Sequence, residues 1–404
     1  MNSVRLVRPA VAVTACLSLG VTGCAALNSA SSGAELTAVK AIPASARHFG
    51  AGGANTAQVV KAANAFLATL SDEQREAALY SFDDPVKKTG WSNFPIPVVQ
   101  RNGLKLGDLT DEQQAAALKV MRAALSKQGY RELVDIRASD DYLASLPNTG
   151  PGGGGGGGGP TGTPTGTPTG TPTGTPTGGP TGRPTGGPGG GGGASFGSDW
   201  YYISFFGKPS TKGEFMVQYG GHHAAYNITY AGRNVTMSPT LTGVEPMEFD
   251  QDGVHYAPLA DKRAASIAAV QSLTADQLTA AELDGSFDDL YLGPGHDGPF
   301  PTPQGVRVSD LSRKQQHAVT KMLATWVDDL NEKAARRLLA KYVSEYDETY
   351  LGWSGGTTLD NNQTYVRIDG PSAWVEFSNQ PGASTSGVHQ HTIFRDETAD
   401  YGWE

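Results

Sequence analysis

Cysteine is nearly absent from this chain of 404 residues, which contains Cys16 and Cys24 and no other thiol. Cys16 falls inside an N-terminal apolar run that would be removed on export. Cys24 falls at the end of that run, where it would be modified. Neither thiol would then remain free in the mature protein. Disulfide bonds, thiolate metal sites and cysteine nucleophiles are therefore excluded.

Long basic runs are absent as well, and the formal net charge at pH 7 is -9. Nucleic-acid binding depends on lysine and arginine side chains that neutralise phosphates, so no nucleic-acid partner is expected. This charge leaves small molecules, metal ions and other proteins as possible partners. The length allows two modest domains or one larger duplicated domain.

The N-terminal apolar run over residues 9–21 is too short to cross a membrane permanently, and it follows Arg5 and Arg8. This pattern is typical of a signal peptide, predicted over residues 1–23. The run ends in Val-Thr-Gly-Cys, which resembles a bacterial lipobox with Cys24 as the lipidated residue. We expect a flexible tether over residues 24–54 and an extracytoplasmic protein, lipid-anchored to the bacterial cell membrane. Ordinary secretion is the alternative.

Two regions about 200 residues apart carry the same sequence pattern. The matching segments are residues 70–74 and 273–277, 81–84 and 286–289, 103–110 and 305–312, 202–207 and 365–370, and 216–218 and 374–376. Self-similarity at so long a period indicates a duplicated unit and not a solenoid.

Residues 148–194 consist almost entirely of Gly, Pro and Thr. A segment without apolar side chains cannot form a core, so it is predicted to be disordered. The repeat resumes beyond it at a shorter spacing, which indicates a loop inserted into the first half, in the place that residues 352–363 occupy in the second. Loop-closure entropy grows slowly with length, so the fold can tolerate this insertion.

Each half begins with signals for two helices. Ser71 and Thr274 are predicted N-caps of the first helices, and Thr110 and Ser312 of the second. Apolar residues follow at helical spacing and are expected in the core: Ala117, Leu118, Met121 and Leu125, then Val319, Met322, Leu323, Trp326 and Leu330.

Each half then changes to strand patterns. Residues 201–206 and 214–219 form one predicted hairpin, and residues 365–368 and 373–377 form another. The first half is thus expected over residues 55–147 (helical part) and 195–262 (strand part), and the second over residues 263–404. A helix pair followed by antiparallel strands, twice, predicts an internally duplicated α+β fold with a pseudo-two-fold arrangement. Any active cleft is expected on that axis.

Histidines close both strand patterns: His222 and His223 in the first half, His389 and His391 in the second. In a strand, His389 and His391 point to one face and the adjacent pair to opposite faces, so at most one of the pair joins them. Three imidazoles with Glu376 as a possible fourth ligand would suit Zn, Cu, Mn or non-haem Fe with an open position. In a metal-dependent hydrolase or oxidase, Glu245 or Glu376 would then move a proton.

Other interpretations of the histidines remain open. A metal-free pocket could capture an anionic small molecule or a cell-wall fragment with Arg367, Arg395 and the histidines. Alternatively, the histidines are hydrogen-bonded core residues, or the site is vestigial in a surface adhesin or scaffold.

Two further motifs are weaker. The Gly-Trp-Ser-Gly-Gly sequence at residues 352–356 has the spelling of a hydrolase nucleophile elbow, but a turn and a strand are predicted after Ser354, where the elbow requires a helix. Asp288, Asp289, His296 and Asp297 lie in an acidic loop that lacks calcium-loop spacing, so a solvated loop is expected.

Several of these segments resemble the bacterial and fungal family called domain of unknown function 3500. They are residues 221–223, 243–246, 353–355, 365–371, 389–396 and 400–402. The resemblance runs from about residue 55 to the C-terminus, apart from the insert. The family tends to carry an acidic residue after the aromatic at position 377, where this chain has Ser378. The resemblance implies a bacterial secreted protein or lipoprotein and names no reaction.

Overall fold

The computed structural model describes residues 52–96, 98–147 and 196–403. The predicted signal peptide, Cys24, most of the tether and the Gly/Pro/Thr-rich insert lie outside these residues. Within them, the protein is a mixed α+β structure, as predicted, with a mostly antiparallel sheet. No helix in this part of the chain is long and apolar enough to span a membrane.

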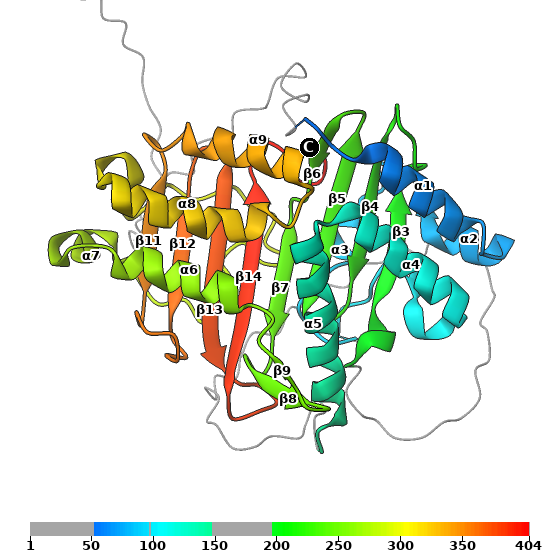
Figure 1. Ribbon diagram of the computed structural model, residues 1–404, viewed down its shortest axis with the longest axis horizontal. Helices are drawn as coiled ribbons and strands as arrows, with labels where there is room; N and C mark the ends of the chain where they lie inside the picture. The colour runs from blue at the N-terminus through cyan, green and yellow to red at the C-terminus, as the bar shows by residue number, and fades with distance from the viewer. Residues whose placement is uncertain (1–51, 97, 148–195, 404) are drawn as a thin grey trace, which may run out of the picture. The chain divides into compact units, whose positions relative to one another are not determined.

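A 12-stranded sheet forms the centre, in the order β1-β3-β4-β5-β7-β14-β13-β12-β11-β10, with β2 paired to β3 and β6 to β5 (Figure 1). The strands of the first half are β1 (Leu79–Tyr80), β2 (Leu104–Lys105), β3 (Tyr202–Phe206), β4 (Glu214–Gly220), β5 (Ala224–Ala231), β6 (Asn234–Thr236) and β7 (Thr240–Val244). Those of the second are β10 (Val306–Arg307), β11 (Tyr350–Ser354), β12 (Tyr365–Asp369), β13 (Ala373–Pro381) and β14 (Val388–Asp396). A separate hairpin pairs β8 (Phe249–Gln251) with β9 (Val254–Tyr256).

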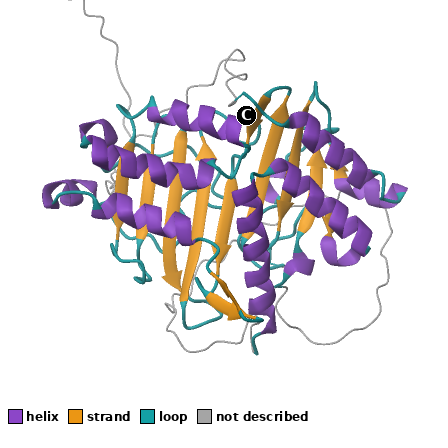
Figure 2. Ribbon diagram, in the orientation of Figure 1, coloured by secondary structure: helices purple, strands orange, loops and turns teal. Residues whose placement is uncertain are grey.

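The longer helices cover one face of this sheet, as Figure 2 shows. They are α1 (Thr56–Leu67), α2 (Asp72–Ala78), α4 (Asp111–Ala124) and α5 (Lys127–Ser145), then α6 (Ala260–Gln271), α7 (Ala275–Ala281), α8 (Arg313–Val327) and α9 (Glu332–Val343). Short turns complete the set: α3 (Val86–Thr89), η2 (Leu106–Asp108), η3 (Ser198–Trp200) and η4 (Val308–Asp310).

All four predicted helix N-caps are confirmed. The side chains of Ser71, Thr110, Thr274 and Ser312 each accept a hydrogen bond from the backbone N–H three residues later. The glutamine at that later position accepts one in turn from the backbone N–H of the N-cap residue. These capping boxes satisfy N–H groups that have no partner inside the helix, and a cap of this kind contributes about 1 kcal/mol. The same local chemistry therefore starts the corresponding helices of both halves.

Apolar side chains pack on both faces of the sheet. On the helix side, the predicted core residues Met121, Met322 and Trp326 are buried against the sheet. On the opposite side, connecting loops supply Trp91 and Leu290, which pack with the strand residues Met216, Trp374 and Ile393. Burial of each such side chain contributes roughly 1.5–3 kcal/mol. Because loops cover the second face, residues from those loops can reach the sheet.

Strand pairing relates the strands of the two halves differently from the sequence comparison. β2 pairs with β3 through Leu104 and Ile203, and β10 pairs with β11 through Val306 and Leu351. By pairing, β3 therefore matches β11, whereas the sequence comparison matched it to β12. The sequence similarity there is short, and strand patterns repeat every second residue, so the alignment can shift by a whole strand. Gly207 and Gly355, which follow β3 and β11, both adopt a positive φ, of 79° and 76°.

Candidate metal centre

The order of the central strands brings the two histidine pairs together. His222 and His223 occupy the turn between β4 and β5, and His389 and His391 lie at the start of β14. β7 runs between β5 and β14, and its Gly243 is paired with His391 and donates its N–H to the carbonyl of His223 at 2.6 Å. The two histidine pairs therefore meet across β7. One pair lies in a turn between two strands, and the other lies within a strand.

Three of the four histidines converge, and His223, His389 and His391 are called the histidine cluster below. One ligand nitrogen from each lies within 4.8 Å of the others. The Nε2 atoms of His223 and His389 are 3.0 Å apart, and the His389 and His391 ring centres are 4.3 Å apart. All three side chains are buried. Of the adjacent pair, His223 lies with His389 and His391 and His222 does not, whereas the sequence allowed at most one of the two to join them.

One nitrogen of the histidine cluster has no partner. Nε2 of His391 is buried and makes no hydrogen bond to the described residues. Leaving a buried polar atom unpaired costs roughly 1–3 kcal/mol, so such an atom calls for an explanation. A nitrogen whose lone pair points at an ion or a bound molecule would provide that explanation.

Gly243 leaves the space in which the rings sit. A Cβ atom at this position would lie 2.8 Å from Cδ2 of His391 and 2.9 Å from Cδ2 of His223. Both distances are shorter than side chains tolerate. Any larger residue at position 243 would push the imidazoles apart.

A carboxylate stands behind each ring of the histidine cluster, at Nδ1. Asp140 Oδ1 lies 2.7 Å from Nδ1 of His223, and Asp289 Oδ1 lies 2.8 Å from Nδ1 of His391. Glu245 Oε2 is farther from Nδ1 of His389, at 3.7 Å, and its Oε1 accepts hydrogen bonds from Ser384 and Thr385. Carboxylates in this position commonly orient metal-binding histidines.

Burial lowers the pKa of His389 well below its ordinary value, assisted by the charge that His391 would carry. For Asp140, burial alone would raise the pKa, but His223 and His222 lower it far below its usual range. Neutral imidazole is the form that binds metals, and an ionised carboxylate is the form that accepts a ring N–H.

His222 belongs to a second group, with Asp140 and His223. Its Nδ1 lies 3.5 Å from Asp140 Oδ1 and makes no hydrogen bond within the part of the chain that the structure describes, while its ring packs on Phe196 with centroids 4.7 Å apart. Burial and the charge of His223 lower the pKa of His222 to about 3. His222 thus lies beside the histidine cluster and not within it.

The structure places the other predicted site residues elsewhere. Glu376 accepts hydrogen bonds from the N–H groups of Tyr291 and Leu292, the hydroxyl of Tyr365 and the indole of Trp374. Its carboxylate is therefore already committed to four donors, none of them a histidine.

Both predicted ligand-binding arginines are buried. Arg395 donates to the Asp297 and Asp400 carboxylates and to the Leu292 and His296 carbonyls. Arg367 lies 3.8 Å from Asp369 and over the ring of Trp374. An anionic ligand would have to displace these partners.

Ser354 is not in a nucleophile elbow. It ends β11, donates to the carbonyl of Gly285 at 2.9 Å, and is followed by a loop and then β12. The acidic loop, in contrast, contributes to the centre through Asp289, for which the sequence predicted only a solvated role. Asp140 was not singled out at all, because its position in a helix far along the chain carries no motif.

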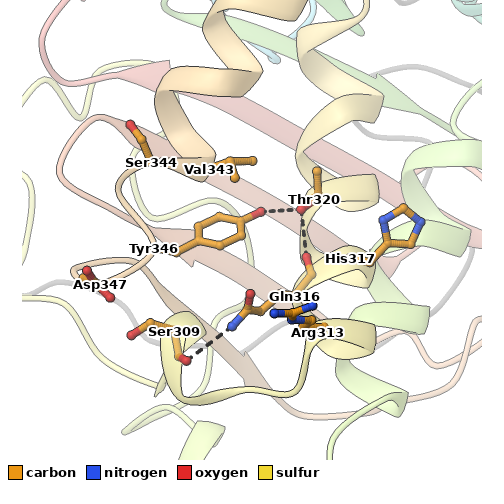
Figure 3. A pocket seen from close by; sticks show the side chains of 9 residues that line it. All are labelled: Ser309, Arg313, Gln316, His317, Thr320, Val343, Ser344, Tyr346 and Asp347. Atoms are coloured by element: carbon orange, nitrogen blue, oxygen red, sulfur yellow. Dashed lines mark hydrogen bonds between the residues drawn. The ribbon is translucent and has the colours of Figure 1, made fainter.

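A surface hollow of about 490 Å³ lies between the start of α8 and the segment that follows α9 (Figure 3). Its lining includes Arg313, His317 and Asp347, and the hydroxyls of Tyr346 and Thr320 are 2.7 Å apart at its wall. None of its lining residues belongs to the histidine cluster.

The fold and the site together define an α+β protein in which buried His and Asp groups could hold a metal ion. Residues 52–403 match the sequence profile of the family described as "Protein of unknown function (DUF3500)". Because the match covers most of the chain, the protein belongs to this family, and the predicted resemblance is confirmed. No curated protein and no solved structure gives a significant match.

Proposed function

We propose that the protein binds one transition-metal ion through the Nε2 atoms of His223, His389 and His391. The observation that carries this proposal is the convergence of three buried imidazoles, one of which has an Nε2 atom that finds no partner among the described residues. An ion bound among the three rings would supply that nitrogen with a partner.

The donor set fits metals that prefer imidazole. Zn–N bonds of about 2.0–2.1 Å in a tetrahedral site place two nitrogens about 3.3 Å apart. The observed separation of 3.0 Å between His223 and His389 is close to that value. Neutral imidazoles without thiolates suit Zn, Cu or Fe better than Mg or Ca, which prefer oxygen ligands. With three protein ligands, the ion keeps an open position, where it would activate water or react with an oxidant.

We further propose that the two halves are copies of one ancestral unit. Matching backbone contacts support this. Gly221 donates to the carbonyl of Ala224 at 2.8 Å in the turn before β5, and Gly370 donates to Ala373 at 2.9 Å in the turn before β13. The first turn joins β4 to β5 and the second joins β12 to β13, and these two hairpins occupy equivalent positions in their halves of the sheet.

The proposed duplication also supports a functional role for the histidines. Under it, the His223–Asp140 contact corresponds to Ser372–Glu345, where the serine hydroxyl donates to the glutamate at 2.8 Å. The fold can therefore be built at this turn without histidine.

The same holds for the other two members of the histidine cluster. His391 and His389 pair with Ser378 and Gln380 of β13, and the corresponding positions of β5 pair with Thr236 and Asn234. The second half thus has histidines at these two positions, and the first half has Asn234 and Thr236. Because the unit folds without histidine there, a ligand-binding role for His389 and His391 is favoured over a packing role.

For its location, we propose that the protein is lipid-anchored at Cys24 on the extracytoplasmic side of a bacterial membrane. The Arg-flanked apolar run and the lipobox-like residues 21–24 support this. The ion would then be acquired outside the cytoplasm.

Metal analysis tests the central proposal. Residues 55–404, purified without a histidine tag, should carry near-stoichiometric Zn, Cu or Fe after reconstitution and dialysis. His391→Ala should lose the ion while remaining folded. His255→Ala is the matched control, because His255 is exposed on the β8–β9 hairpin. Absence of metal from the reconstituted wild type, or equal retention by His391→Ala, would overturn the proposal.

A further inference from the structure

We infer that Asp140 and Asp289 are positioning residues, which fix the proton of His223 and of His391 on Nδ1 and so leave both Nε2 lone pairs facing one point. The inference rests on the proposed metal site for its functional meaning. Its structural content, a defined tautomer, applies to the metal-free protein as well.

Asp140 reaches the site from α5, in the helical layer, and its side chain is fully buried. Oδ2 already accepts the hydroxyl of Tyr201 at 2.7 Å and the backbone N–H of His223 at 3.3 Å. Oδ1 faces Nδ1 of His223 at 2.7 Å. A carboxylate can only accept, so the ring must donate from Nδ1, and its lone pair is then on Nε2.

Asp289 reaches the site from the opposite layer, in the loop between α7 and β10. Its Oδ1 lies 2.8 Å from Nδ1 of His391. The same oxygen accepts from the amide of Gln380 at 2.6 Å and from the backbone N–H of Leu290 at 2.7 Å, while Asn93 donates to Oδ2 at 3.3 Å. These donors hold the carboxylate in place against the ring.

The side-chain amides of Gln380 and Asn93 also lie 2.9 Å and 3.3 Å from the same ring nitrogen. They compete with Asp289 for it, but only if that nitrogen is unprotonated. A hydrogen bond to an ionised carboxylate is about twice as strong as one between neutral groups, so the Nδ1–H form is favoured. This assignment explains why the unpartnered nitrogen of His391 is Nε2.

The two carboxylates differ in how they are held. Asp140 is buried in a helix, whereas the Asp289 side chain is 40% exposed on a loop. Replacement of Asp289 should therefore leave the fold intact, while replacement of Asp140 leaves the Tyr201 hydroxyl with a weaker acceptor. Loss of such a carboxylate typically weakens metal affinity 10–100-fold.

The test compares Asp289→Asn and Asp140→Asn with Asp288→Asn and Asp141→Asn, whose side chains neighbour them in sequence and are exposed. Zn²⁺ affinity is measured by competition with a chromophoric chelator, and the histidine tautomers of the metal-free proteins by ¹⁵N NMR. We expect Nδ1–H forms of His223 and His391 in the wild type. Each cluster variant should lose its own Nδ1–H signature and bind Zn²⁺ roughly 10–100-fold more weakly, and the controls should do neither.

The outcomes separate the two proposals. Wild-type protein with the expected tautomers but no Zn²⁺ binding would overturn the metal site alone. Zn²⁺ binding by the wild type that Asp289→Asn and Asp140→Asn retain undiminished, or Nε2–H tautomers in the metal-free wild type, would overturn the positioning role. Asp289→Asn keeps the test decisive if Asp140→Asn fails to fold.

Discussion

The hydroxyl of Thr392 on β14 lies 2.8 Å from the hydroxyl of Thr242 on β7, at the junction between the strands of the two halves. Thr392 also accepts the indole N–H of Trp326 at 3.0 Å, which ties α8 to the middle of the sheet. All three side chains are buried. A series of hydrogen-bonded side chains, Trp326, Thr392 and Thr242, is thus buried in the apolar core at this junction.

Replacement of Thr392 by valine should destabilise the protein, because Trp326 and Thr242 would each lose a buried partner. The expected loss in the free energy of unfolding is about 1–3 kcal/mol. Urea unfolding followed by circular dichroism measures it. Thr358→Val, at an exposed loop position, should change stability by less than about 0.5 kcal/mol. An equal effect of the two variants would contradict the role of the junction.

Stability should fall as the pH rises from 6 to 9. Lys262 contacts Glu132 and lies 2.9 Å from Asp329, with all three buried in the helical layer. Burial raises the pKa of Glu132 from 4.5 to about 8, although Lys262 opposes the shift. The folded state therefore retains a proton that the unfolded chain has lost, and this contribution disappears as the pH passes through about 8.

Glu132→Gln removes this titration. Between pH 6 and pH 9 the wild type should lose about 3 kcal/mol more stability than the variant. Glu112→Gln, an exposed change on α4, serves as the control and should follow the wild type. Parallel stability curves for the wild type and Glu132→Gln would show that Glu132 is ionised throughout.

Gly243→Ala should disrupt the histidine cluster. The added methyl group would meet the rings of His391 and His223 at under 3 Å, so the rings must separate. We expect loss of metal binding and destabilisation of about 1–3 kcal/mol from overpacking. Gly298→Ala is the control, because a Cβ atom there meets nothing within 4 Å. Unchanged metal content in Gly243→Ala would show that the rings do not need this space.

Cys24→Ala should release the full-length protein from membranes. A single acyl chain binds membranes only marginally, whereas the diacylglyceryl group of a lipoprotein anchors stably. Fractionation of bacterial cells expressing the two forms, with mass spectrometry of the N-terminal peptide, measures the result. Equal membrane retention of the variant, or an unmodified Cys24 in the wild type, would contradict the anchor.

Local chemistry explains which parts of the fold the sequence could predict. The N-caps Ser71, Thr110, Thr274 and Ser312 act within four residues, so their glutamine partners are visible in the sequence. The sequence comparison matched β3 to β12, whereas the pairing of β2 with β3 and of β10 with β11 gives β3 and β11 equivalent places. Strand pairing depends on distant segments, so it could not be read from the sequence.

The candidate site also has a part that the sequence could predict and a part that it could not. The spacing of His389 and His391 places both on one face of a strand, and this was readable from the sequence. Asp140 and Asp289 meet the rings only because α5 packs on one side of the sheet and a loop on the other. Arg367 and Arg395 looked available in the sequence, but tertiary packing supplies them with internal partners.

The sheet ends in very short strands on both sides. β1 (Leu79–Tyr80) and β10 (Val306–Arg307) each offer only two residues at the outer edges. Open edges are templates on which another chain can add a strand and start aggregation. A sheet this wide, with its longest strands in the interior, therefore presents little backbone for edge-to-edge association, even where many copies are concentrated.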